Sequence, residues 1–485
     1  MKENVRGKAF SGEFSERLHI SFSRKLSLQV FGFVQGVILA RLLSPSDYGL
    51  IAMVVIFILI SYNFVDAGFG TALIQKKKRK EIDYSTVFVL NLSLSFLISL
   101  ILFLVAPLIS SFYNEPPLIK IVRVYSFIIF LNSLISIQEV RLSVFLEFRK
   151  KSVVSIVTTI VSGILSIILA VAGYGVWSLI YPQFLNLLIK VILYWHYQHW
   201  IPKLAFSLKS FYDLFGFGSR IFASTLLSTF SGNIYSLVIG KMFSARLLGF
   251  YSRADGYAAL PAQTITGVLD SVTYPVFSKF QDDDVQLVNS FRRILRVSAY
   301  VIFPIMTGLA VLAKPLVVVL VTEKWLSCVA YLQVLCFARV WLHVQNLNLN
   351  ILKAKGCSNL LLNLEVVRQL AVIFFLVLTA SFGIMSICIG SIFAALVSMF
   401  VNSYFTGKEI QFGIVKQLKE MLPSMFYSSL MGLIIYISTI FISSMLLKVL
   451  IGIFIGVVSY LLISIVTKSQ DLKYLQMLVC EKLKK

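Results

Sequence analysis

Long apolar runs alternate with short polar or charged breaks along almost the whole chain. Each run is about 20 residues long, which is the length that an α-helix needs to cross a bilayer. Several breaks, such as those at residues 114–117 and 173–175, are so short that the flanking runs must form antiparallel helical hairpins. The pattern predicts about fourteen transmembrane helices, over residues 22–43, 47–67, 84–110, 118–138, 152–173, 175–195, 211–240, 247–275, 293–320, 327–350, 362–382, 384–404, 423–446 and 448–467.

Composition excludes a soluble protein. The 485 residues are 58% hydrophobic and 14% charged, with a mean hydropathy of +0.86. A soluble domain carries about a quarter charged residues, so this chain has too few charges to solvate a soluble surface of its length. No apolar run is interrupted by a soluble insertion. We therefore predict an all-α polytopic membrane protein.

The positive charge is spread over alternate loops. The 44 Lys and Arg outnumber the 22 Asp and Glu and give a net charge of +22, and basic clusters such as 76–80 and 149–151 lie in every second loop. This asymmetry is typical of cytoplasmic loops, and it predicts cytoplasmic termini and an even number of spans. A nucleic-acid partner is not expected, because it needs a contiguous basic face. The five cysteines lack metal-ligand spacing, and no ATP or cofactor signature is present, so neither a metal nor a cofactor is expected.

An internal repeat is visible at an offset of 200 residues. Ile38–Leu43 aligns with Val238–Phe243, and Tyr48–Leu50 aligns with Leu248–Phe250. An even number of spans separates the two copies, so they are predicted to be parallel six-helix lobes, a plan that places the substrate between the repeats. The predicted organisation is a cytoplasmic N-terminal segment (1–21), an N-terminal lobe (22–195), a cytoplasmic linker (196–210), a C-terminal lobe (211–404), an extra helix pair (405–467) and a basic cytoplasmic tail (468–485).

Three segments carry a family resemblance. Ala40–Leu50 (ARLLSPSDYGL), Asp66–Gln75 (DAGFGTALIQ) and Tyr251–Asp255 (YSRAD) resemble the polysaccharide transporter branch of the multidrug/oligosaccharidyl-lipid/polysaccharide exporter superfamily. The resemblance implies a flippase, not an enzyme, in the bacterial inner membrane. Such a protein moves an undecaprenyl-diphosphate-linked oligosaccharide, the repeat unit of an O-antigen, capsule or exopolysaccharide, by alternating access. Its implied partners are this lipid-linked cargo, membrane lipid and a polysaccharide polymerase.

Other functions remain open at this point. An ion-coupled drug or metabolite exporter shares the superfamily fold, and a flippase for a lipid-linked peptidoglycan precursor differs in cargo alone. A membrane-embedded glycosyltransferase is disfavoured, because the outer loops are too short to carry a catalytic centre.

Charged residues inside the spans are the candidate site residues, since each costs about 2.5–3.5 kcal/mol at a helix centre. We expect Arg24, Arg220, Arg253 and Arg339 to line the cavity and bind the diphosphate, because guanidinium groups match phosphate oxygens in bidentate geometry. The alternatives are ion pairing between helices and, for Arg24, extension of the side chain to the membrane surface.

Three carboxylates are candidates for ion coupling. Without an ATP-binding signature, transport must draw on a gradient, and intramembrane acids are the usual proton or sodium carriers. These acids are Asp66, Asp255 and Asp270, of which Asp66 and Asp270 occupy similar repeat positions. The alternative is that Asp66 and Asp270 cap helix ends.

Overall fold

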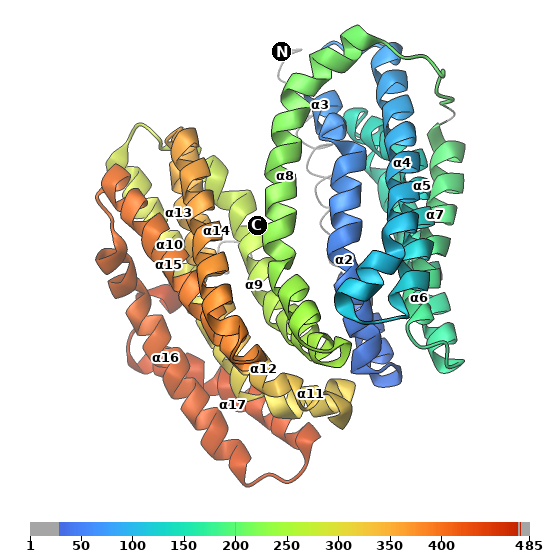
Figure 1. Cartoon of the computed structure of the whole chain (residues 1–485). Helices are drawn as coiled ribbons and strands as arrows, with labels where there is room; N and C mark the ends of the chain where they lie inside the picture. The colour runs from blue at the N-terminus through green and yellow to red at the C-terminus, as the bar shows by residue number, and fades with distance from the viewer. Residues whose placement is uncertain (1–28, 199, 474–475, 477–485) are drawn as a thin grey trace. The chain divides into compact units, whose positions relative to one another are not determined.

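The computed structural model describes residues 29–198, 200–473 and 476, and every regular element in this part of the chain is helical (Figure 1). The helices are Gln29–Leu42, α2 (Pro45–Asp66), α3 (Phe69–Gln75), α4 (Glu81–Tyr113), α5 (Leu118–Val144), α6 (Phe148–Val171), α7 (Trp177–Gln198), α8 (Leu208–Met242), α9 (Ala245–Lys279), α10 (Asp284–Val311), α11 (Ala313–Val321), the 3₁₀ helix η1 (Glu323–Trp325), α12 (Cys328–Arg339), α13 (Leu342–Ala354), α14 (Ser358–Ala380), α15 (Ile384–Ile410), α16 (Ile414–Ile440) and α17 (Met445–Val466).

The all-helical, multi-pass architecture is confirmed, but the number of fourteen spans is not. Twelve helical segments in the described residues are long and apolar enough to cross a membrane. The two remaining predicted spans correspond to the short helix Gln29–Leu42, whose predicted beginning lies outside the described residues, and to α9. α9 has 35 residues, so it falls short in apolarity and not in length.

The chain divides into two compact units, one ending at Gly249 and the other beginning at Phe250. In the first unit, α8 packs against α2, α3 and α4. In the second unit, α10 packs against α12 and α16, and α14 packs against α15. The lobe boundaries inferred from the sequence remain predictions.

Equivalent helix starts support the 200-residue repeat. α2 begins at Pro45 after a capping box in which the Asp47 amide donates to Ser44 Oγ (3.3 Å) and the Ser44 amide donates to Asp47 Oδ2 (2.9 Å). At the matching position, α9 begins at Ala245 and the Leu247 amide donates to Ser244 Oγ (3.3 Å). The preceding helices end at residues 42 and 242.

α16 packs against α10, and polar contacts fasten α17 and the residues after it to α10 within the second unit. The Tyr300 hydroxyl donates to Ser464 Oγ (2.8 Å), and the Tyr460 hydroxyl donates to the Tyr300 carbonyl (2.8 Å). Closer to the chain terminus, Arg296 Nε lies 2.9 Å from Asp471 Oδ1. α16 and α17 are therefore integral to this unit.

Candidate functional site

α8 presents an exposed polar stripe inside a membrane-spanning helix. Arg220, Ser224 and Ser228 follow one another at four-residue intervals and are all exposed, as is Thr225. Residues four apart lie on one helix face. Lipid-exposed polar and charged groups are costly in the hydrocarbon region, where such groups normally face water or protein. We therefore expect this face of α8 to contact water or polar groups within the membrane.

α9 has a comparable face. Gln263, Gly267 and Ser271 are exposed at four-residue intervals, with Thr264 beside Gln263. Pro261 and Pro275 lie inside the same helix, and each removes a backbone donor from the helix. The polar residues of α9 explain why its apolarity falls below that of the other long helices.

Arg339, a predicted diphosphate-binding residue, and Asp255, a predicted ion-coupling residue, contact each other in the second unit. Arg339, at the end of α12, donates from Nε to Asp255 Oδ1 on α9 at 3.0 Å, and its Nη2 lies 2.5 Å from the same oxygen. The side chains are 35% and 27% exposed. The structure thus places a predicted diphosphate ligand and a predicted coupling acid in one ion pair, which is the interhelical alternative raised by the sequence. Arg253 is half-buried on α9, with Tyr257 and Cys328 in its electrostatic surroundings.

Asp270 is held by neutral amides. Asn350 Nδ2 donates to Asp270 Oδ1 (2.8 Å) and to Thr273 Oγ1 (2.9 Å), while Asn346 Nδ2 donates to Asp270 Oδ2 (3.3 Å). The two asparagines are one turn apart on α13, so they reach α9 from the same face. No salt bridge to Asp270 is formed by the described residues. These amides were not predicted from the sequence, although the Asn-Leu-Asn-Leu-Asn pattern at 346–350 was a visible signal.

The middle asparagine of this pattern serves another contact. Asn348 Nδ2 donates to Gln417 Oε1 on α16 (3.0 Å), and Ser403 Oγ on α15 donates to the same oxygen (3.0 Å). All three side chains are buried. α13 therefore joins the Asp270 contacts on α9 to a buried polar cluster on α15 and α16.

Asp66 ends α2 and organises the turn into α3. Its Oδ1 accepts a hydrogen bond from the Gly70 amide (3.2 Å), and Ala67 and Gly68 both have positive φ (44° and 77°). A Cβ at Gly68 would lie 2.2 Å from the Gly218 carbonyl oxygen on α8. This helix-cap geometry is the alternative role raised for Asp66. It shapes the turn so that two backbones meet closely.

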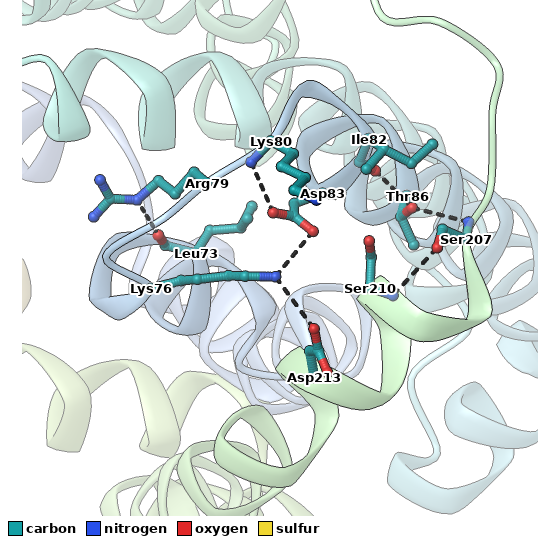
Figure 2. A network of polar contacts seen from close by, with 10 residues as sticks. All are labelled: Leu73, Lys76, Arg79, Lys80, Ile82, Asp83, Thr86, Ser207, Ser210 and Asp213. Carbon is teal, nitrogen blue, oxygen red and sulfur yellow. Dashed lines mark hydrogen bonds and ion pairs between the residues drawn. The ribbon is translucent and has the colours of Figure 1, made fainter.

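A charged network surrounds Asp83 at the start of α4, as Figure 2 shows. Lys76 Nζ lies 3.0 Å from Asp83 Oδ1 and 3.6 Å from Asp213 Oδ2 on α8. The Lys80 amide donates to the other Asp83 oxygen (2.9 Å). The Asp83 side chain is 2% exposed, whereas that of Asp213 is 50% exposed. From the sequence this lysine cluster was interpreted as a loop-charge signal, and Asp83 was not singled out.

The segment between α7 and α8 is tied to α4 and α5 beside this network. The Trp200 indole donates to Glu81 Oε2 (2.7 Å), and the Arg141 guanidinium lies over the Trp200 ring at 4.6 Å from its centroid. The Ser207 amide donates to Thr86 Oγ1 (3.1 Å) (Figure 2). We call residues 200–207 the strap, because they hold the start of α8 to α4 and α5.

The candidate residues thus fall into separate groups. Arg220 lies in the first unit, whereas Arg253, Asp255, Asp270 and Arg339 lie in the second. Arg24 lies outside the described residues. Within the part of the chain that the structure describes, no group of three or more His, Cys, Asp or Glu side chains could hold a metal ion.

Comparisons with known proteins give a family and a fold. A family model described as "Polysaccharide biosynthesis protein" matches residues 38–330, more than half of the chain. The teichuronic acid biosynthesis protein TuaB of Bacillus subtilis (strain 168) is 28% identical over 299 residues, which cover 61% of this chain and 62% of that protein. The lipopolysaccharide biosynthesis protein WzxC of Escherichia coli (strain K12) is 26% identical over 331 residues, 67% of this chain and 66% of that protein. The chain therefore matches less than two thirds of the length of each relative.

Among solved structures, the lipid II flippase MurJ in its inward closed conformation superposes with a TM-score of 0.77. The match covers 93% of this chain and 98% of that chain at 16% sequence identity. At this identity the likeness establishes the fold alone.

Proposed function

Because this chain belongs to the family of polysaccharide biosynthesis proteins, we propose that it is a flippase for a polyprenyl-diphosphate-linked oligosaccharide. The resemblance read from the hairpin motifs is confirmed by the family match. In this proposal the cargo crosses from the cytoplasmic to the outer leaflet of a bacterial inner membrane by alternating access. The basic loops, including 76–80, face the cytoplasm together with both termini. A polysaccharide polymerase is the proposed protein partner.

The observation that carries this proposal is the pair of exposed polar faces on α8 and α9. A sugar chain needs hydroxyl and amide partners, and these faces offer Ser224, Ser228 and Thr225 on one helix and Gln263 and Ser271 on the other. The prenyl tail needs no such partners and stays in lipid. Each helix by itself therefore offers a polar surface to which the sugar headgroup could bind.

The arginines are proposed to hold the diphosphate. Arg220 is the exposed cation on the α8 stripe, and Arg253 lies half-buried on α9. Arg339 is already paired with Asp255, so we expect it to contribute less to diphosphate binding than Arg220 and Arg253. Arg24 is the fourth proposed diphosphate-binding residue. Guanidinium groups bind phosphate oxygens more strongly than uncharged donors do.

Asp270 is the carboxylate that we propose for ion coupling. Asn346 and Asn350 contact it without adding charge, so its charge can be satisfied by a bound proton or sodium ion. Asp255 already has Arg339 as a partner, and Asp66 is committed to backbone amides. We therefore rank these two acids lower.

The test follows a labelled undecaprenyl-diphosphate oligosaccharide in proteoliposomes and measures how fast the label becomes accessible to an external enzyme. We expect the wild-type protein to accelerate exposure, and an imposed proton or sodium gradient to change the rate. Arg220→Ala combined with Arg253→Ala should lower the rate at least tenfold at equal membrane abundance. Lys209→Ala, an exposed cation three turns earlier on α8, is the matched control.

Other outcomes separate the alternatives. Full activity of the double arginine variant would remove the diphosphate assignment. Equal transport of a lipid-linked peptidoglycan precursor would reassign the cargo. Export of a cationic dye without any lipid flipping would instead favour a drug exporter.

A further inference from the structure

The hairpin of α4 and α5 carries an arginine close to its turn at residues 114–117. The two helices pack along each other within the first unit (Figure 1). Arg123 is the sixth residue of α5, so it lies about 7.5 Å along the axis from the start of this helix. Its guanidinium carbon lies 4.7 Å from the centroid of the Phe103 ring on α4. The Phe103 ring in turn packs edge-to-face on Phe127, one turn after Arg123, with the ring centroids 6.2 Å apart.

The charge of Arg123 is not neutralised by the described part of the chain. Its Nε atom is buried without a hydrogen-bond partner, and no described acid forms a salt bridge with its guanidinium. The Phe103 ring attracts the cation but adds no negative charge. Arg141, at the other end of α5 beside the strap, is instead paired with Glu81 at 3.3 Å. Because a cation in a membrane helix is costly, Arg123 calls for an anion that these helices do not supply.

The surface that continues from Arg123 along the hairpin is aromatic and exposed. Phe127 is 58% exposed and Phe96 is 62% exposed. The Phe96 ring packs edge-to-face on Phe130, with centroids 6.4 Å apart, which repeats the Phe103–Phe127 pair seven residues earlier on α4. We call these four phenylalanines the aromatic row. Exposed apolar side chains on a membrane helix contact lipid chains, so the row is a surface for an acyl chain.

A second cation lies beside Arg123. Lys120 is exposed and stands three residues earlier on α5, and residues three apart on a helix are neighbours. Glu115, the acid of the preceding turn, forms no salt bridge with either cation in the described residues. Two neighbouring cations attract a ligand with net negative charge more strongly than a zwitterionic ligand.

We propose that Arg123, Lys120 and the aromatic row form a binding site for an anionic glycerophospholipid. The guanidinium binds the lipid phosphate, whose oxygens match its planar fork, and an acyl chain lies along the aromatic row. In the proposed orientation the turn at residues 114–117 is on the outer side, so the lipid belongs to the outer leaflet. The site uses none of the residues proposed to bind the cargo, and its occupancy needs no transport.

The test measures lipid affinity by native mass spectrometry of the full-length protein, purified in a mild detergent and titrated with phosphatidylglycerol. Arg123→Gln keeps a long side chain over Phe103 but removes the charge, so we expect about tenfold weaker binding of the tightest-bound phosphatidylglycerol. Arg123→Lys keeps the charge without the planar fork, and binding should weaken about threefold. Lys448→Gln is the matched control, because Lys448 is also a half-buried cation near a helix start, and it should bind as the wild type does.

Several outcomes would overturn the proposal. Equal phosphatidylglycerol affinity in the wild type and in Arg123→Gln would remove Arg123 from the site. Equal binding of phosphatidylglycerol and phosphatidylcholine by the wild type would show that the cations do not select an anionic headgroup. Displacement of phosphatidylglycerol by a tenfold lower concentration of undecaprenyl phosphate would make the prenyl carrier the occupant. Displacement by inorganic phosphate would show that the aromatic row contributes nothing.

Two exposed positions keep the test decisive if Arg123→Gln fails to accumulate. Lys120→Gln and Phe127→Leu change exposed side chains, so we expect little effect on folding. Each should weaken phosphatidylglycerol binding about twofold, and the double variant about fourfold if the contributions add. Wild-type affinity in the double variant would contradict the site. The assay needs no cargo, so a negative flipping result leaves the lipid site standing, and a negative binding result leaves the proposed cargo untouched.

Discussion

Two buried or half-buried carboxylates, Asp83 in the first unit and Asp270 in the second, are satisfied by opposite means. Asp83 has a lysine at 3.0 Å and a backbone amide at 2.9 Å. Asp270 has two side-chain amides, which carry no net charge. A cation fixes the ionised state of its partner, whereas amides tolerate a change of charge. The difference separates a structural anchor from a site that can gain and lose an ion.

The largest expected effect comes from removing the charge of the anchor. Asp83→Asn leaves Lys76 without its close partner and weakens the start of α4, so we expect a loss of about 3 kcal/mol, at the lower end for a broken buried pair because Lys76 is partly exposed. Thermal unfolding in detergent and membrane abundance measure this loss. A variant as stable as the wild type would show that Asp83 is no anchor.

Asp270→Asn should have the opposite effect, with a small loss of stability and a large change in transport. An amide keeps the size of the side chain and one acceptor for Asn350, so we expect stability to fall by about 1 kcal/mol. Transport should lose its response to an imposed ion gradient, because the ionisable group is gone. The flipping assay with and without a gradient measures this response. A retained gradient response would assign coupling to another acid.

Removing the Asp255–Arg339 ion pair should have an intermediate effect on stability. Both side chains are partly exposed, so a double-mutant cycle with Asp255→Ala and Arg339→Ala should give a coupling energy of about 1 kcal/mol. Unfolding of the four proteins in detergent provides the energies. A coupling near zero would free Arg339 for the diphosphate and raise its share in binding.

The smallest effect is expected at Asp213. Its side chain is half exposed and lies 3.6 Å from Lys76, so Asp213→Asn should change stability by about 0.5 kcal/mol or less. The same unfolding measurement compares it with Asp83→Asn. Equal losses at the two positions would show that Lys76 depends on both acids alike.

Periodicity and hydropathy were sufficient for the helical architecture, because apolar length and loop charge are local properties. The repeat offset was also readable, and the structure reproduces it in the starts of α2 and α9. The count of fourteen spans is not confirmed at α9, where the exposed Gln263 and Ser271 stand in place of apolar residues.

The candidate site was less predictable, because its partners are distant in sequence. Arg339 and Asp255 are 84 positions apart, and Asn350 and Asp270 are 80 positions apart. Spacing along one helix cannot reveal a partner on another helix. The role of Asp66 was also undecided from the sequence, because an acidic residue near the end of a span is compatible with both an ion site and a helix cap.

Gly49 and Gly249 pack reciprocally: a Cβ at Gly49 would lie 1.7 Å from the Ala245 carbonyl oxygen, and a Cβ at Gly249 would lie 1.8 Å from that of Pro45. This packing has the form of an isologous dimer interface, in which the same patch of surface meets itself across a two-fold axis. Here both copies of the patch belong to one polypeptide. A side chain added at either glycine therefore meets a backbone carbonyl at the equivalent place.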